Sequence, residues 1–470
     1  MRSSRSVGIA SLVVLSVLHG RTAGAQSAPL DAPPSATNAG SSAQSPASGA
    51  GEPAHGPLAV NARSSGGLEL TGAFGRGYTL RTPDERFSLT LRARIQVRGT
   101  LDLSMARLAS PAATPDPLTD PLRAEFNLRR ARIVMQGNAY TRALQYYIQL
   151  GVSPLDMESD LLIPLRDAYL TWTPHRYFAI RAGQMKVPFS RQRVISSGSL
   201  QFVDRSGTNA ELNLDRDLGV QFRSDELFGH RLGYMVGVFG GDGRNRPTLD
   251  SGLLYVARVQ IQPLGRFEDM DVEGDHKRGG PRLSIGLAGA YNVRSRRALS
   301  TLGATYTLGR FDYASATADV MFKWAGFSLQ TEAILRVADR PWSTGMVNGV
   351  ARTEFSRSAF GVMLQAAYQL PSHLEFGARY SQVTPIGLDR AAFGAQALPT
   401  PTMGATVDVR DPSFHETHEL GAVLSYYWLE HSVKLQLDYF YLFRDQAFYA
   451  GRSRFDEGNH QLRLQAQLML

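Results

Sequence analysis

The chain alternates apolar and polar residues over a long stretch that begins at Phe87. From there to Leu103 the odd-numbered positions are apolar or glycine, and the even-numbered positions are polar or charged. Successive side chains of a β-strand point to opposite faces, so the pattern predicts a strand with one apolar and one polar face. Its length of about seventeen residues far exceeds the five or six typical of strands. Such a strand is long enough to cross a bilayer, and we expect Leu91 on its apolar face near the bilayer midplane.

Shorter runs of the same kind follow as far as the C-terminus. They cover residues 126–137, 144–150, 168–172, 178–183, 218–222, 232–238, 255–261, 283–293, 318–324, 327–337, 360–370, 374–380, 420–426, 433–441 and 462–470. Brief links, such as 325–326 and 371–373, alternate with loops of about a dozen to three dozen residues. Short turns at one end and long loops at the other are typical of outer-membrane barrels. The sequence therefore predicts an all-β fold, a transmembrane antiparallel β-barrel of about 16 strands over residues 67–470.

Two segments of different composition precede the predicted barrel. Arg2 and Arg5 come before an apolar run at 7–18, and small residues follow at 23–25, so residues 1–25 are predicted to be a signal peptide. The apolar run is shorter than the roughly 20 residues of a membrane-spanning helix. Residues 26–66 consist mostly of alanine, serine, glycine and proline, which predicts a disordered periplasmic linker. Export and a barrel together indicate the outer membrane of a Gram-negative-type bacterium.

The charge is moderate and carried almost entirely by arginine. The formal net charge is +8, and loss of the three arginines of the signal peptide lowers it to +5, which gives no indication of a nucleic-acid partner. Only 4 of the 50 basic residues are lysines. This bias has two explanations: genome composition, or a need for planar guanidinium groups that bind anions. The absence of cysteine excludes disulfides and thiolate metal sites.

The polar faces of the predicted strands carry most of the candidate chemistry. Arg92, Arg94 and Arg98 share one face and, at about 3.3 Å per residue, extend over roughly 20 Å. Inward positions on other strands are Arg223, Arg258, Lys323 and Arg379. Two interpretations remain open. These residues form a path along which an anion moves from one cation to the next, or they pair with inward acids across strands and produce a stiff, weakly selective wall.

Several motifs in the middle of the chain match one known family. They are GQMKVPF at 183–189, QFVDRS at 201–206 and RDLGVQ at 216–221, accompanied by LRDAY at 165–169 and RRAR at 129–132. With these motifs the chain resembles the phosphate-selective porin O and P family over residues 68–470. The resemblance implies a barrel of sixteen strands that is usually trimeric, with a third long loop folded into the lumen. By the motif match, Lys186, Arg191, Arg193 and Arg205 become candidate constriction residues. The scarcity of lysine departs from the selective members of the family.

The expected function is that of an outer-membrane porin. We expect passive diffusion of small solutes with a preference for anions, phosphate or polyphosphate among them, through a homotrimer in outer-membrane lipid without a cofactor. A non-selective general porin, a structural barrel and a barrel enzyme are the alternatives. The enzyme is disfavoured because the histidines lack a recognisable catalytic motif, and a structural barrel usually has fewer strands. The metal-like fragments at 415–418 and 269–275 lack the required ligand spacing, and we interpret the second as a solvated acidic turn.

Overall fold

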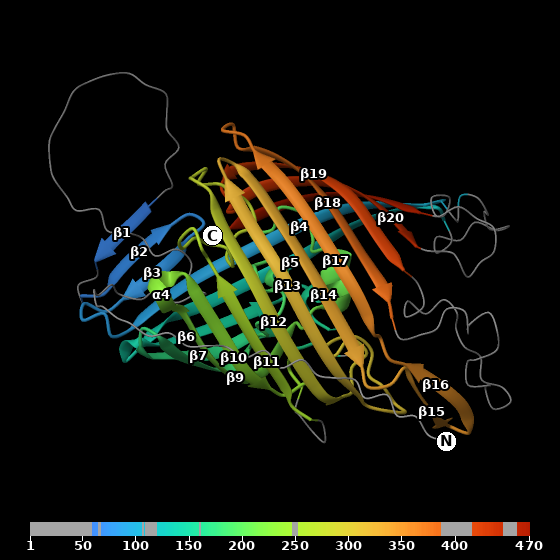
Figure 1. Cartoon of the computed structure of the whole chain (residues 1–470). Helices are drawn as coiled ribbons and strands as arrows, with labels where there is room; N and C mark the ends of the chain where they lie inside the picture. The colour runs from blue at the N-terminus through green and yellow to red at the C-terminus, as the bar shows by residue number, and fades with distance from the viewer. Residues whose placement is uncertain are drawn as a thin grey trace.

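A computed structural model describes residues 59–63, 67–105, 108, 120–158, 161–246, 252–386, 416–444 and 458–470. Nineteen strands form one antiparallel sheet, and sixteen of them close into a barrel because β21 pairs with β4 (Figure 1). The predicted fold class and strand number are confirmed. The predicted signal peptide, residues 1–25, and most of the predicted linker lie outside the described residues.

The barrel strands follow one another around the wall in chain order. They are β4 (Ser88–Ser104), β5 (Leu122–Ala139), β6 (Thr141–Gly151), β7 (Leu165–His175), β8 (Phe178–Lys186), β9 (Arg216–Glu226), β10 (Leu232–Phe239), β11 (Leu254–Ile261), β12 (Arg282–Ser295), β13 (Phe311–Trp324), β14 (Phe327–Ala338), β17 (Ala359–Gln369), β18 (Leu374–Pro385), β19 (Thr417–Leu429), β20 (Val433–Arg444) and β21 (Asn459–Met469). A separate hairpin, β15 (Trp342–Val347) and β16 (Val350–Phe355), lies in the connection between β14 and β17.

Helices in the described part of the chain are few and short. They are the 3₁₀ helix η1 (Pro154–Asp156) and the α-helices α2 (Arg191–Val194), α3 (Gly207–Leu212) and α4 (Leu227–His230). None of the helices in the described part of the chain has the length and apolar character needed to traverse a membrane.

The alternation along β4 separates an outer apolar face from an inner polar face. Leu91 and Val97 are 46% and 49% exposed, whereas Arg94 is 8% exposed. In a barrel, exposed apolar side chains are those that contact lipid. The expected depth of Leu91 is wrong, however, because it pairs with Tyr78 of the N-terminal extension, beyond the point where β21 ends opposite Arg94. Val97 lies nearer the middle of the part of β4 that belongs to the barrel.

Connections at one end of the barrel are short, as the sequence predicts. Ala325 and Gly326 link β13 to β14 with positive φ angles of 50° and 95°, the backbone conformation of a tight two-residue hairpin. We call this the short-turn end. One connection there departs from the rule: residues 262–281, between β11 and β12, form a long segment. It contains the acidic run 269–275, and our interpretation of that run as solvated is wrong, because Asp269, Glu273 and Asp275 are buried.

Three strands extend the sheet at the short-turn end. They are β1 (Ala59–Arg63), β2 (Glu69–Ala73) and β3 (Gly77–Arg81), and β3 pairs with the first part of β4 (Figure 1). Gly75, in the turn between β2 and β3, approaches the turn between β19 and β20 so closely that a Cβ atom would lie 2.0 Å from Ser432 Oγ. Residues 59–63, which fall within the expected linker, form β1 and pair in register with β2.

Candidate functional site

The third long loop, residues 187–215, lies inside the barrel; we call it the inner loop. It carries α2 and α3, each capped at its N-terminus by a serine, Ser190 and Ser206, whose hydroxyl accepts a backbone N–H. The loop leaves the wall at β8 and returns to it at β9, and hydrogen bonds join it to distant strands of the wall. Lys434 Nζ on β20 donates to Leu200 O at 2.7 Å, and Thr208 Oγ1 donates to Val362 O on β17 at 2.7 Å. The inner loop therefore crosses the lumen.

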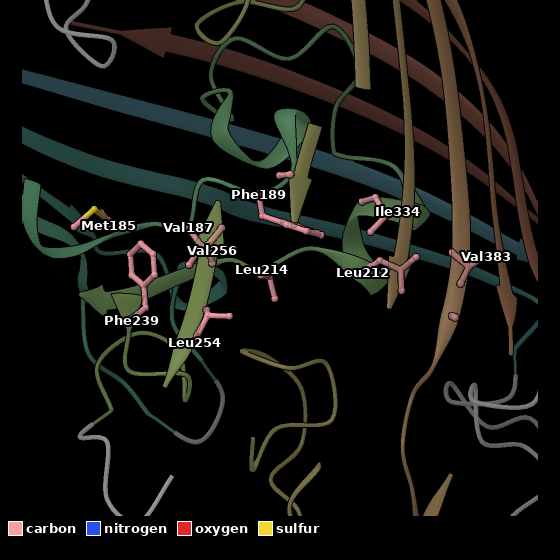
Figure 2. Packing of buried hydrophobic residues seen from close by; sticks show 12 residues of the cluster. Met185, Val187, Phe189, Leu212, Leu214, Phe239, Leu254, Val256, Ile334 and Val383 are labelled. Carbon is pink, nitrogen blue, oxygen red and sulfur yellow. The ribbon is translucent and has the colours of Figure 1, made fainter. Parts of the chain in front are cut away.

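An apolar cluster holds the inner loop against one side of the wall. Val187, Phe189 and Leu212 are fully buried and belong to a cluster that includes Val256 on β11 and Ile334 on β14 (Figure 2). On β14, Ile334 lies between the inward polar residues Glu332 and Arg336. Burial of apolar surface stabilises the docked loop by about 25 cal/mol per Å². The polar lumen thus contains a local hydrophobic core built for this loop.

Three arginines from β4 and β5 converge on Asp204 of the inner loop. Its carboxylate accepts from Arg98 at 3.1 Å, from Arg129 at 3.2 Å and from Arg130 at 3.0 Å. Two consecutive arginines reach the same acid because the pairing of β4 with β5 shifts by one residue here, and such a bulge turns an extra side chain inward. Burial raises the pKa of Asp204, but the three arginines outweigh it and hold the pKa well below its usual range. One permanent negative charge is therefore shared by three positive charges.

Arg94 contacts hydroxyl groups of the inner loop. Its Nη1 and Nη2 donate to Ser196 Oγ at 3.2 Å and Ser197 Oγ at 2.9 Å, while its buried Nε has no hydrogen-bond partner within the described part of the chain. Ser197 Oγ also accepts from Arg132, which forms an ion pair of 2.6 Å with Asp156. Gly198 permits this approach, because a Cβ atom there would lie 2.2 Å from Arg94 Nη1. Arg94 therefore retains an uncompensated positive charge beside the loop.

The basic residues of the inner loop and Lys186, at the end of β8, mostly brace the loop backbone. Arg205 Nε donates to Gln192 O at 2.8 Å and its Nη2 to Ile195 O at 2.7 Å, and Lys186 Nζ donates to Val194 O. Arg193 pairs with Asp215, with 2.6 Å between Nε and Oδ1. Burial raises the pKa of Asp215, but Arg193 and Arg216 together hold it well below its usual range. The backbone of α2 and of the turn after it is thus stabilised by the guanidinium group of Arg205 and the ammonium group of Lys186.

The remaining predicted site residues are spread around the lumen. Arg191 lies in a buried network with Asp319 at 2.5 Å and Asp269 at 2.8 Å, and Arg258 joins Asp319 at 2.7 Å. The others lie farther along the wall: Arg92 donates to Gln136 Oε1, Lys323 to Glu268 O and Val272 O, and Arg379 to Glu419, while Arg223 is buried on β9. The structure thus brings Arg94 and Arg98 to the inner loop, which carries Arg191, Arg193 and Arg205, and Lys186 contacts the loop from the end of β8. Arg258 and Arg379 also reach the loop, where they donate to Phe189 O at 2.7 Å and to Asp204 O at 2.8 Å.

Sequence reasoning missed the contribution of β5. Arg129, Arg130 and Arg132 were recognised only as part of a family motif, although they are three of the five arginines that contact the side chains of Asp204 and Ser197. The signal in the sequence was the arginine doublet, which breaks the alternation of inward and outward positions. Among the described residues, no group of three histidine, aspartate or glutamate side chains is arranged to hold a metal ion.

The closed barrel, the inner loop and its arginines together match one family. The model of the family described as phosphate-selective porin O and P matches residues 118–469. The chain belongs to this family. It is an outer-membrane porin, so the short-turn end faces the periplasm and the long loops face the outside.

Solved structures of similar fold are porins and outer-membrane channels of low sequence identity. An anion-selective porin from Comamonas acidovorans is 13% identical, with 82% of this chain and 100% of that chain covered and a TM-score of 0.48. The outer membrane channel DcaP of Acinetobacter baumannii is 13% identical, with 81% and 97% covered and a TM-score of 0.48. OmpF of Salmonella typhi is 14% identical, with 82% and 99% covered and a TM-score of 0.47. No curated protein matches the sequence.

Proposed function

We propose that this porin prefers anions and that phosphate binds transiently in its lumen. The observation that carries the proposal is the sharing of Asp204 by Arg98, Arg129 and Arg130, next to Arg94, which has no carboxylate partner among the described residues. Several positive charges in a narrow pore lower the entry barrier for anions and raise it for cations. Because a guanidinium fork matches the geometry of phosphate oxygens, phosphate is retained longer than chloride.

The basic residues predicted from the sequence fall into two groups with different proposed roles. Arg92, Arg94, Arg98, Lys186 and Arg205 are proposed to attract anions directly. The paired residues Arg191, Arg193, Arg258 and Arg379 are proposed to shape the wall and the inner loop, because each lies within 3.0 Å of a carboxylate that balances its charge. A wall made only of such pairs favours a general porin, and this is the second candidate function.

The two candidates differ in reversal potential. In planar bilayers with a potassium chloride gradient, the wild-type porin is expected to show a reversal potential on the anion-selective side, and replacement of Arg92, Arg94 and Arg98 by Gln is expected to move it toward cation preference. The preference weakens as salt rises, because the screening length falls from about 10 Å at 0.1 M to about 3 Å at 1 M. Anion preference is falsified if the triple variant and the wild type have the same reversal potential.

Phosphate specificity needs a separate measurement. Phosphate added to a chloride current is expected to reduce that current in a saturable manner in the wild type and to have less effect after Arg94→Gln. The control is sulfate, whose oxygens have a similar tetrahedral arrangement, added at equal ionic strength. A chloride current that falls no further with phosphate than with sulfate leaves an anion-preferring porin without phosphate selectivity.

We also propose the assembly and processing that the sequence suggests. The porin is proposed to be a homotrimer in outer-membrane lipid, which mass measurement of the detergent-solubilised protein tests directly. Cleavage after Ala25 is proposed to leave Gln26 as the first residue of the mature chain, and N-terminal sequencing of the purified porin tests this.

A further inference from the structure

The connection between β11 and β12 enters the lumen from the periplasmic end; we call residues 262–281 the inward turn. With twenty residues it is far longer than the two-residue link between β13 and β14. Its side chains Asp269, Met270, Glu273 and Asp275 are buried. A buried carboxylate is stable only when it has partners. The partners of these acids therefore show where the inward turn is held.

One group of partners belongs to the inner loop. Asp269 Oδ2 accepts from Arg191 Nη1 at 2.8 Å, and Glu273 Oε2 accepts from the backbone N–H of Gln201 at 2.8 Å. The backbone N–H of Glu273 donates to Ser199 O at 3.2 Å. Two segments that enter the barrel from opposite ends therefore meet inside it.

The other partners belong to the barrel wall near the periplasmic end. Lys323 Nζ on β13 donates to Val272 O at 2.6 Å and to Glu268 O at 3.2 Å. The backbone N–H of Gly326, in the turn after β13, donates to Asp275 Oδ2 at 2.8 Å. The ring nitrogens Nε2 of His276 and of His431, in the turn after β19, lie 2.9 Å apart. These contacts fix the inward turn at both of its ends.

We infer that the inward turn is a second constriction of the pore, which narrows the periplasmic half of the lumen and holds the inner loop in place. Asp269 and Glu273 act as positioning residues, because they bind Arg191 and Gln201 of the inner loop rather than a passing solute. The inference rests on the proposed conduction through this lumen but not on its selectivity. A porin with no anion preference would still have two constrictions.

The first test replaces residues 266–279 by Asn-Gly, which forms a two-residue hairpin turn. Conductance of a water-filled pore rises with its narrowest cross-section, so we expect about a twofold increase in single-channel conductance. A matched control replaces 370–373, the turn between β17 and β18, in the same way and is expected to conduct as the wild type. A folded variant without the inward turn that conducts as the wild type overturns the inference.

The second test leaves the length of the chain unchanged. Asp269→Asn combined with Glu273→Gln removes the attachments to the inner loop, and we expect higher conductance with larger open-channel current fluctuations. The control is Glu268→Gln in the same turn, because Glu268 pairs with the exposed Lys277 and does not contact the inner loop. Fluctuations of the same size in both variants would show that the two acids do not position the loop.

The third test uses the absence of cysteine in the chain. Ser199→Cys with Glu273→Cys places two thiols on hydrogen-bonded segments. Because this pair removes the Glu273 carboxylate, the reduced variant is expected to conduct more than the wild type, and oxidation is expected to cross-link the thiols and lower the conductance again. A pair that does not cross-link in the folded porin overturns the docking, and equal conductance in the oxidised and reduced states overturns the positioning role of Glu273. Reversal potential, measured on the same channels, reports the proposed anion preference separately.

Discussion

Two parts of the barrel wall, β4–β5 and β18–β21, differ on the inside although they are alike on the outside. On β4 and β5 the arginines outnumber the acids that they contact, since Arg98, Arg129 and Arg130 share Asp204. On β18–β21 two arginines each pair with one acid of the neighbouring strand: Arg379 with Glu419, and Arg463 with Asp438. Both parts present leucine, valine and aromatic residues to lipid. The difference shows that the fold constrains the outer face, whereas the inner face is free to vary in charge.

The origin of the two inner faces is also different. Pairs on β18–β21 are formed by residues within adjacent strands, so each cation has a fixed neighbour. The acids available to β4 and β5, Asp204 and Asp156, come from loops and are fewer than the arginines around them. An excess of positive charge therefore remains on one side of the lumen and not on the other. The predictions below are ordered from the largest expected effect to the smallest.

The largest effect is expected on the outer faces of the two parts of the wall, where an arginine substitution should lower the stability of the barrel equally. Val97→Arg on β4 and Leu437→Arg on β20 each place a charge against lipid, and each is expected to lower the free energy of unfolding by about 2–4 kcal/mol if the site is near the bilayer midplane. Urea unfolding in lipid vesicles, followed by tryptophan fluorescence, measures both. Leu91→Arg is the control at the periplasmic rim, with an expected cost of about 0–1 kcal/mol. Equal costs at Leu91 and Val97 would contradict the assigned depth.

The second prediction removes the arginine excess. Arg129→Gln with Arg130→Gln takes two positive charges from the bulge while Asp204 keeps Arg98. Each charge contributes about 1 kcal/mol to a nearby ion in water, so loss of two charges is expected to lower the ratio of chloride to potassium permeability by about thirtyfold. Reversal potential in a salt gradient measures the ratio. An unchanged ratio would mean that β4 and β5 do not differ functionally from the paired strands.

The third prediction is a change in the opposite direction, an increase in the preference for anions. Asp204→Asn removes one negative charge from among three arginines, and the chloride to potassium ratio is expected to rise about fivefold, the equivalent of about 1 kcal/mol. Because the pKa of Asp204 is held well below its usual range, the effect is expected to be the same at every pH from mild acid upward. A rise that appears only at high pH would show that Asp204 is protonated near neutrality.

The sequence was sufficient to predict the strands but not the contacts between side chains inside the barrel. Alternation along residues 87–103 follows directly from lipid on one side and water on the other, so strand number and the direction of Arg94 were predictable. The arginine doublet at 129–130 was not, because strict alternation sends the two side chains to opposite faces and only a bulge brings both inward.

Loop positions depend on partners that are distant in the sequence. Asp269 of the inward turn bonds to Arg191, and Glu273 to Gln201, with more than seventy residues between the partners in each case. An acidic run such as 269–275 is usually solvated, and nothing local distinguishes this one. Its burial follows from cations that other strands and the inner loop bring to it, such as Lys323.

The fourth prediction concerns the periplasmic end of the paired strands, where His276 and His431 meet. Lys434 Nζ lies 3.3 Å from His431 Nδ1, so His431 is the donor from Nε2 to His276 and both rings are neutral. Burial, together with Lys323 and Lys434, lowers the pKa of His276 to about 3, and burial with Lys434 and His276 lowers that of His431 well below its usual value. Other groups that face the pair are Asp275, His373 and Tyr427.

Folded pKa values below the ordinary 6.5 of histidine set the direction of the pH effect. The docked inward turn has its full stability above about pH 6.5 and loses stability as the pH falls from there toward 3. Each histidine lowers the stability by up to about 1.4 kcal/mol for every pH unit in that range. Conductance is therefore expected to be constant above pH 6.5 and to increase in acid. His276→Gln with His431→Gln is expected to abolish this dependence, and an unchanged acid response in the double variant would assign it to other groups.

The smallest effect is expected on the paired strands themselves. Arg379 and Glu419 face each other with 2.8 Å between Nε and Oε1, so their fields largely cancel at the distance of a passing ion. Arg379→Gln with Glu419→Gln leaves the net charge unchanged, and the reversal potential is expected to stay at the wild-type value. Each single substitution is expected to move it, toward cations for Arg379→Gln and toward anions for Glu419→Gln, because it leaves one charge uncompensated. The two shifts should cancel in the double variant. A double variant that shifts as far as Arg129→Gln with Arg130→Gln would show that paired arginines attract anions as strongly as shared ones, and the distinction between the two parts of the wall would then have no consequence for permeation.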